Sequence, residues 1–346
     1  MRTWQFFLVS LAVALAVFFA ARLYQNDYLF FAGYVVLQFI VLATAWNILG
    51  GYCGYVNFGS AAFFAIGAYT TVVMTKLPAF ANRNLPPEIA SFVGSITPPP
   101  IPVLIVLGGL VAGLVGLGTG YLTLRLRGVF FAIATLALAV VLQTLIVNWD
   151  FVGGSRGAYV IRPATVAWLG IGYIEYLFLV MLVLVVVSLT TARAIERSRL
   201  GYGFATIRDD ELAAEASGVP TLRLKLVATT LSGAFMGMAG APFPYYIGFL
   251  EPSSAFGLAY AVNAIALPML GGTTSWVGPL VGAVLLGTLQ QLATVTISSA
   301  VSLLIVGLLL VFFVIIAPNG IIGWFQYFSS RKSTDLKEQP APVKSS

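Results

Sequence analysis

The chain has 346 residues, of which 59% are hydrophobic and only 9% are charged. Because a soluble globular chain carries roughly 25% charged residues, this composition excludes an ordinary soluble domain and predicts an all-α, polytopic bundle of membrane-spanning helices. The net charge of +6 does not indicate nucleic-acid binding, since the basic residues cluster between the apolar segments and in the C-terminal tail.

About ten apolar segments are candidates for crossing a bilayer, which takes about 20 residues of helix. We place these spans at 5–24, 29–49, 57–75, 102–124, 128–147, 174–192, 226–247, 257–271, 276–297 and 301–317. The first also resembles a cleaved signal peptide, but the many spans that follow predict a retained helix. The eighth is short and ends at Leu267–Pro268 before a glycine pair, so a broken or re-entrant segment is an alternative there.

The basic residues predict which side of the membrane each connection faces. If both termini lie in the cytoplasm, the outside segments hold five of the 18 basic residues, namely Arg22, Lys76, Arg83, Arg156 and Arg162. All the others then lie inside, as the positive-inside tendency requires, and the reverse topology would invert that ratio. The sequence therefore predicts cytoplasmic N- and C-termini.

Two segments outside the spans have distinct compositions. The proline-rich stretch 78–102 predicts an external connection. Residues 329–346 are polar, contain Pro340 and Pro342, and predict a disordered cytoplasmic tail. The chain is thus expected to form one membrane domain, 1–328, followed by the tail.

Polar groups inside the spans are almost all neutral. Ionisable groups at the centre of a bilayer normally mark proton relays or ion sites, and their scarcity argues against a proton-coupled pump acting alone. Neutral side chains such as Asn57 and Asn263 either form hydrogen bonds between helices or line a translocation path, because each lies near a glycine break.

Glycines spaced four residues apart predict close contacts between helices. Such a pair makes a flat strip on one helix face and lets a neighbouring backbone approach. The pairs are Gly109 and Gly113, Gly116 and Gly120, Gly233 and Gly237, and Gly278 and Gly282.

One connection, Thr191–Lys225, is longer than most others and contains six basic and five acidic residues. The pattern over 206–217 predicts a short helix, with Asp209, Asp210 and Glu211 near its positive N-terminal end. Gly218, followed by Val219 and Pro220, predicts where this helix stops.

This connection is either a solvated loop that only sets topology or a docking segment. Ala213, Ala214 and Ala216 would leave a smooth surface that the groove of a partner protein could receive closely, which favours docking.

The chain contains no recognisable machinery for chemistry or energy coupling. One cysteine and no histidine exclude an internal disulfide, a His/Cys metal site and histidine-based catalysis. A phosphate-binding P-loop requires a Gly-Lys dipeptide, and the sequence has none. Transport driven by ATP would therefore need an ATPase on a separate chain.

These motifs resemble the LivM-type permeases of branched-chain amino acid ABC importers over about residues 30–325. The long connection is similar to that family's cytoplasmic coupling loop. The matching stretches there are Arg197–Ser198–Arg199–x–Gly201, Ile207–Arg208–Asp209–Asp210–Glu211, Ala213–Ala214–Glu215–Ala216–x–Gly218 and Lys225–Leu226. Further matches begin at Trp46–Asn47, Leu124–Arg125 and Gly271–Gly272.

Two positions depart from the family pattern. Ser60 stands where the family usually has histidine, and Leu212 stands where the wider pattern of ABC importers has glutamate. The first departure puts in doubt any role of a histidine there. We include Ser60 with Asn57 and Asn263 as candidates for the translocation path.

The resemblance implies a non-catalytic permease subunit in the bacterial inner membrane, without a cofactor. Its partners would be a homologous second permease, either an unlike chain or a second copy, two cytoplasmic ATPases and a periplasmic binding protein. Each permease would offer one coupling helix to an ATPase. In this chain the implied ATPase-coupling residues are Arg208, Asp209, Asp210, Glu211, Ala213, Ala214, Glu215 and Gly218.

The expected cargo is a branched-chain or related neutral amino acid. A permease for urea or short-chain amides, built on the same scaffold, is the nearest alternative. A stand-alone secondary transporter is an alternative from another class, but it would be expected to carry buried Asp, Glu or His.

Overall fold

The computed structural model describes residues 2–24, 26–163, 165–166 and 170–296, together with Leu304, Gly307, Leu308, Val311, Gly320, Ile321 and Gly323. Most of the predicted tenth span and the whole tail 329–346 lie outside the described residues. The prediction of a disordered tail is therefore not addressed by the structure.

Within the described part, nine segments are long and apolar enough to cross a membrane. They agree in place with the first nine predicted spans and establish a multi-pass helical bundle. The segments are α1 (Thr3–Leu23), α2 (Asp27–Leu49), α3 (Ser60–Asn84), α5 (Ile101–Thr123), α6 (Val129–Val147), α7 (Tyr173–Glu196), α10 (Thr221–Gly240) with α11 (Phe243–Ile247), α12 (Pro252–Ala255) with α13 (Leu258–Gly271), and α14 (Val277–Thr296).

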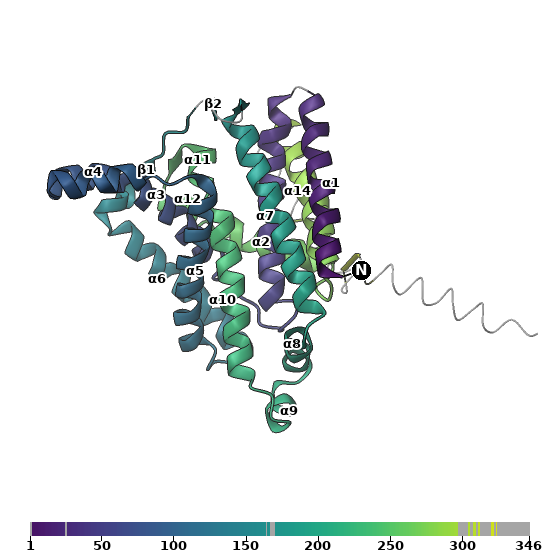
Figure 1. Ribbon diagram of the computed structural model, residues 1–346. Coiled ribbons are helices and arrows are strands. Elements are labelled where there is room, and N and C mark those ends of the chain that lie inside the picture. Colours follow the sequence, from purple (N-terminus) through teal and green to yellow (C-terminus); the bar gives the residue numbers. More distant parts are fainter. Residues whose placement is uncertain are drawn as a thin grey trace, which may run out of the picture.

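The remaining elements are short and lie at the two ends of the bundle. Figure 1 shows α8 (Arg199–Asp209) and α9 (Glu211–Ala216) beyond the ends of α7 and α10, and α4 (Pro87–Ile96) toward the opposite end. Two strand pairs also occur, β1 (Ala158–Tyr159) with β4 (Phe249–Leu250) and β2 (Thr165–Val166) with β3 (Ile171–Gly172), both antiparallel. Short 3₁₀ turns span Asp150–Val152 and Gly154–Arg156.

Two predicted boundaries are refined by the structure. The connection 78–102 is largely helical, because α3 continues through Pro78 to Asn84 and α4 begins with Pro87 in its first turn, where the missing N–H is not needed. The predicted eighth span, 257–271, corresponds to α13, which is continuous through Pro268, so the break expected there is absent; the short helix α12 ends at Ala255, before this span. Alone, the 14 residues of α13 extend only about 21 Å, less than the roughly 30 Å hydrocarbon core.

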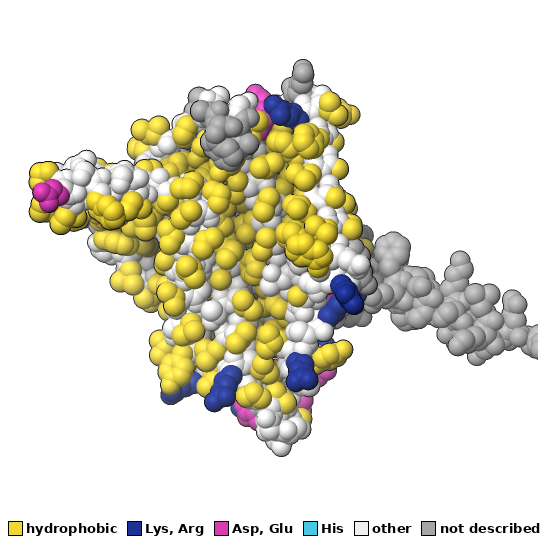
Figure 2. Space-filling view, in the orientation of Figure 1, with side chains coloured by type: hydrophobic (Ala, Val, Ile, Leu, Met, Phe, Trp, Pro, Cys, Tyr) yellow, Lys and Arg dark blue, Asp and Glu magenta, His cyan; other side chains and the backbone are white. Residues whose placement is uncertain are grey.

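The core forms around the second half of α2, where every residue from Leu37 to Leu49 is buried. In contrast, α1 buries only Ala14 and Phe18, and α6 only Phe131 and Thr135. Apolar side chains cover the middle of the visible face in Figure 2, and basic side chains gather at the end that carries α8 and α9. That charge distribution agrees with a cytoplasmic α8–α9 end, although the orientation stays a prediction.

The paired glycines lie where helices cross, as predicted. A Cβ added at Gly113 would lie 3.2 Å from the Ala234 side chain, and one added at Gly116 would lie 3.2 Å from the Thr229 carbonyl oxygen, both on α10. A Cβ at Gly237 would overlap Ala112 on α5. The α5–α10 crossing is therefore built from backbone in close contact.

Candidate functional site

The predicted helix over 206–217 is in fact two helices. Asp210 has an extended backbone, with φ −158° and ψ 108°, and separates α8 from α9. Its carboxylate accepts hydrogen bonds from the N–H groups of Leu212 at 2.9 Å and Ala213 at 3.0 Å. An aspartate that caps the N-terminus of a helix competes with continuation of the preceding helix, which explains the break. The expectation that acidic residues lie at the start of α9 holds for Asp210 and Glu211, whereas Asp209 ends α8.

Gly218 ends α9 as the sequence predicts. Its φ of +81° lies in the left-handed region, which glycine adopts without steric cost. The N–H of Gly218 donates to the carbonyl of Glu215 and that of Val219 donates to the carbonyl of Ala214, both at 3.0 Å. This pair of bonds is the Schellman arrangement, which satisfies carbonyls that a helix end leaves free.

The exposed residues of α9 differ from those expected from the sequence. Ala213 and Ala216 are exposed, and Leu212 is 64% exposed. Ala214 is only 5% exposed and faces the body of the molecule, so its predicted place in the smooth outer surface is wrong. The outward surface instead combines the two exposed alanines with the leucine.

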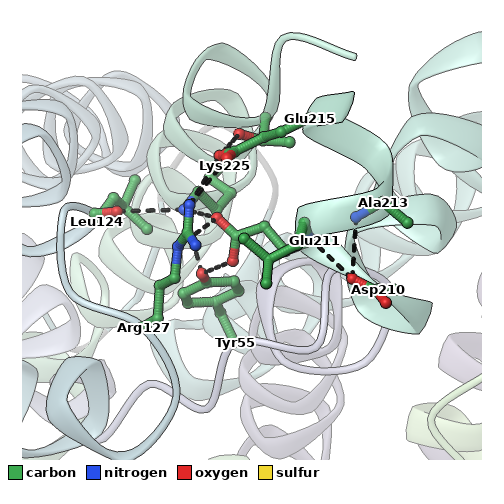
Figure 3. Close-up of polar contacts among 10 residues, drawn as sticks. Tyr55, Leu124, Arg127, Asp210, Glu211, Ala213, Glu215 and Lys225 are labelled. Carbon is green, nitrogen blue, oxygen red and sulfur yellow. Dashed lines mark hydrogen bonds and ion pairs between the residues drawn. The ribbon is translucent and has the colours of Figure 1, made fainter. Parts of the chain in front are cut away.

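A buried lysine on α10 holds α9 against the bundle (Figure 3). The Lys225 ammonium is within 2.7 Å of Glu211 Oε1, 3.1 Å of the Tyr55 hydroxyl and 3.2 Å of the Leu124 carbonyl oxygen. All three of its N–H donors therefore have acceptors. The Lys225 side chain is only 3% exposed and that of Glu211 is 12% exposed.

Tyr55 and Arg127 complete this contact from two separate connections. The Tyr55 hydroxyl donates to Glu211 Oε2, and burial, followed by the neighbouring Glu211 carboxylate, raises the pKa of the phenol. Arg127 Nη2 lies 2.9 Å from Glu215 Oε2, and Arg127 Nε lies 3.5 Å from Glu211 Oε1. Thr221 donates to Glu215 Oε1 at 2.8 Å, and this bond, with Arg127, lowers the pKa of the Glu215 carboxyl.

We refer to Tyr55, Arg127, Glu211, Glu215 and Lys225 as the α9 anchor. It connects four parts of the chain: the α2–α3 connection, the α5–α6 turn, α9 and α10. Removing one member of a buried ion pair leaves an uncompensated charge, so such a cluster strongly fixes the position of the elements that carry it.

The end of α7 is tied to the same end of the bundle by a second set of contacts. Glu196 accepts hydrogen bonds from the Trp276 backbone N–H at 2.9 Å and the Tyr52 hydroxyl at 3.5 Å. The guanidinium of the buried Arg193 lies 4.1 Å from the centre of the Phe6 ring on α1. The connections before α3 and before α14 therefore both contact α7 where the α8–α9 segment begins.

Arg208 and Asp209 do not join the α9 anchor. They pair with each other at 3.3 Å, and the Asp209 side chain is 72% exposed. An exposed pair of this kind contributes little to stability, so these two residues do little to hold the fold.

The three candidates for a translocation path are all buried but separate. Asn57 accepts a hydrogen bond from the Gly59 N–H at 2.8 Å, which is a local structural role at the start of α3. The Ser60 hydroxyl has no hydrogen-bond partner among the described residues. Asn263 is 6% exposed on α13, and no hydrogen bond in the described part of the chain joins it to Asn57 or Ser60. The path assignment stays a prediction.

Sequence reasoning missed Tyr55, Arg127 and Lys225 as a functional group. In the sequence, Lys225 is one of the basic residues that set topology and part of a stretch that resembles the family's coupling loop, and neither observation predicts a buried ion pair. Its position one turn inside the apolar helix α10, which begins at Thr221, was the available signal, because a lysine there needs a partner. Nothing in the sequence identified that partner as Glu211.

Comparison with known proteins identifies a family model and several relatives, all of them permease components. The family model for "Branched-chain amino acid transport system / permease component" matches residues 28–314. The high-affinity branched-chain amino acid transport permease LivM of Salmonella typhimurium is 30% identical over 331 residues, covering 89% of this chain and 73% of the relative. LivM of Escherichia coli is 30% identical over 312 residues, with coverage of 83% and 68%.

A more distant relative carries a different name. The ribose import permease RbsC of Escherichia coli is 24% identical over 238 residues, covering 66% of this chain and 73% of the relative. No solved structure matches the chain.

Proposed function

Because this chain belongs to the family of permease components of branched-chain amino acid transport systems, we propose that it is the membrane subunit of an ATP-driven importer for branched-chain or related neutral amino acids. Its partners in this proposal are a homologous second permease, two cytoplasmic ABC ATPases and a periplasmic binding protein. The complex would reside in the bacterial inner membrane, with both termini of this chain in the cytoplasm. The chain itself would catalyse no reaction.

The observation that carries the proposal is the form of α9. It is a short helix with a capped start and end, it projects from one end of the bundle, and its outward side is formed by Leu212, Ala213 and Ala216. Small side chains allow the groove of an ATPase to approach the helix backbone closely. The inward side is fixed by the α9 anchor, so a displacement of α9 cannot occur without a force on the elements bound to it.

The α9 anchor also suggests how ATP-driven movement would reach the membrane segments. Lys225 belongs to α10, Tyr55 precedes α3, and Arg127 precedes α6. When ATP closes the two ATPases, a shift of α9 would be transmitted through these three residues to three different helices. In this view the buried ion pair is a mechanical link, and no side chain acts as acid, base or nucleophile.

The alternatives gain no support from the matched relatives. The LivM and RbsC relatives described above are named for branched-chain amino acid and ribose systems, and neither name describes a urea or amide importer or a secondary transporter. We therefore retain the branched-chain amino acid cargo.

The docking surface is tested by size-changing substitutions at an exposed position. We expect Ala213→Trp to abolish both uptake of L-leucine by the reconstituted complex and co-purification of the ATPases, because the larger ring prevents close approach. Ala213→Ser keeps a small side chain and is expected to behave as the wild type. Both variants should insert into the membrane and unfold at the wild-type temperature, since the outward side of α9 does not support the fold. Normal uptake and ATPase recruitment by Ala213→Trp would exclude this surface as the docking site.

The cargo is tested in the same reconstituted complex. Uptake of radiolabelled L-leucine should be inhibited by L-valine and L-isoleucine and should be unaffected by urea or acetamide. If urea inhibited this uptake and L-valine and L-isoleucine did not, the proposed cargo would be wrong.

A further inference from the structure

A cavity opens at the end of the molecule opposite to α9. It has a volume of about 480 Å³ and lies between the start of α2, the start of α7 and the segment that precedes β2. This volume falls in the range of pockets that bind small molecules, roughly 300–1,000 Å³. Apolar and charged side chains share its wall: Phe30, Phe31, Tyr173, Ile174, Asp27, Arg162 and Glu175.

The charged groups of this cavity do not neutralise one another. No ion pair within 4.0 Å joins Arg162 to Asp27 or Glu175, although all three side chains line the same wall. Glu175 Oε2 is shielded from solvent and has no hydrogen-bond partner among the described residues. The Glu175 carboxylate therefore has hydrogen-bonding capacity that the described residues leave unused.

The cavity also offers donors for an anionic group. Arg162 uses one N–H to donate to the Tyr246 carbonyl at 3.2 Å, and its guanidinium lies 5.8 Å from the centre of the Phe31 ring. A guanidinium has five N–H donors in all. The first turn of α7 adds more, because its N-cap is Gly172 and no side chain caps it. The free N–H groups at a helix start favour a carboxylate.

We propose that this cavity binds an α-amino acid with an aliphatic side chain, as a receiving site at the outer end of the permease. The carboxylate of the amino acid would bind Arg162 and the start of α7, and its ammonium would bind Glu175 and Asp27. The aliphatic side chain would pack on Phe30 and Phe31. The inference rests on the proposed function for the identity of the ligand, but the separation of opposite charges in one cavity is an independent observation.

The test measures binding to the purified full-length chain in a detergent that carries no phospholipid. Saturation-transfer NMR or calorimetry would compare L-leucine with two analogues that each lack one charge. L-Leucinamide has no carboxylate, and 4-methylpentanoate has no ammonium. We expect both to bind at least about tenfold more weakly than L-leucine, because each loses a charge-assisted hydrogen bond.

Two variants should separate the two halves of the site. Glu175→Gln should weaken the binding of L-leucine by about tenfold or more and should not weaken the binding of 4-methylpentanoate, because that analogue has no ammonium for Glu175 to bind. Arg162→Gln should weaken the binding of both L-leucine and 4-methylpentanoate. Matched controls are Glu88→Gln and Arg83→Gln, which make the same changes at exposed positions outside the cavity and should leave binding unaltered. Equal thermal unfolding temperatures would establish that Glu175→Gln is folded.

Several results would overturn the inference. One is the absence of L-leucine binding, and another is binding that neither cavity variant weakens. Phosphatidylethanolamine also carries an ammonium and an oxyanion, so native mass spectrometry would detect a lipid retained by the wild type. Loss of that lipid in Glu175→Gln, without L-leucine binding in the wild type, would assign the cavity to a lipid headgroup.

The outcome can be separated from that of the proposed function. Normal L-leucine uptake by the reconstituted complex, without L-leucine binding to the isolated chain, would reject the receiving site and leave the function standing. L-Leucine binding that follows the predicted pattern, without L-leucine uptake, would support the cavity and reject the proposed cargo.

Discussion

The Glu211–Lys225 ion pair permits a quantitative test of the α9 anchor. Glu211→Gln leaves the Lys225 ammonium with neutral acceptors only: the Tyr55 hydroxyl, the Leu124 carbonyl and the new amide oxygen. Since the ammonium stays almost fully buried, we expect a loss of unfolding free energy of about 3 kcal/mol, the lower end of the range for breaking a buried pair.

The reverse substitution should be less harmful. Lys225→Met leaves the Glu211 carboxylate in contact with both the Tyr55 hydroxyl and Arg127, so one charge-assisted contact is lost and a cost of about 2 kcal/mol is expected. The double variant removes both charges, so its loss of unfolding free energy should be smaller than the sum of the losses in the two single variants. We expect a coupling energy of about 1–3 kcal/mol. The same variants should reduce L-leucine uptake more than they reduce ATPase co-purification, because the docking surface is intact and the link to the bundle is not.

Reversible unfolding in mixed detergent micelles measures these free energies. Asp209→Asn is the matched control, because it removes an exposed carboxylate two residues away and should change the unfolding free energy by less than about 0.5 kcal/mol. Additive effects of the two single substitutions, or equal losses for Glu211→Gln and Asp209→Asn, would refute the account of the α9 anchor as a coupled unit.

Two further predictions follow from burial at other positions. Cys53 is fully buried next to the α9 anchor, and burial raises the pKa of its thiol, so maleimide at pH 7.5 should label the native chain far more slowly than the detergent-unfolded chain. Labelling should accelerate in Glu211→Gln, and equal rates in native and unfolded wild type would contradict the burial. Gly237→Val should lower the unfolding free energy by about 1–3 kcal/mol, because the new side chain overlaps Ala112 on α5. Gly118→Val places the same side chain at an exposed site with no atom within 4 Å and should cost nothing, and a similar loss in both would exclude tight α5–α10 packing.

The sequence predicted the elements whose signal is local. Long apolar runs identify membrane helices because lipid leaves the backbone no other way to satisfy its hydrogen bonds, and the nine described spans follow that rule. Gly218 was equally predictable, since its neighbours already mark a helix end. The break at Asp210 was missed because aspartate suits both the interior of a polar helix and a cap, and only the backbone angles distinguish the two.

The α9 anchor could not be predicted because its members are far apart in the chain. Tyr55, Arg127, Glu211 and Lys225 belong to four separate elements, and no periodicity relates them. The burial of Ala214 was missed for a similar reason. The sequence gives the spacing of residues around α9, but the side that faces the bundle depends on how α9 is attached.

The capping of α9 at both ends has a consequence for how the sequence of such a permease can change. Asp210 accepts the first N–H groups of the helix, and the left-handed Gly218 lets its own N–H and that of Val219 bond the last carbonyls, so both ends of α9 are satisfied within residues 210–219. Within this stretch, Glu211 and Glu215 carry the ion pairs to the rest of the chain. The outward positions are free to change by mutation without loss of the fold. Under the proposed function, the outward surface of α9 can therefore change to suit a different ATPase while the contacts of the α9 anchor stay the same.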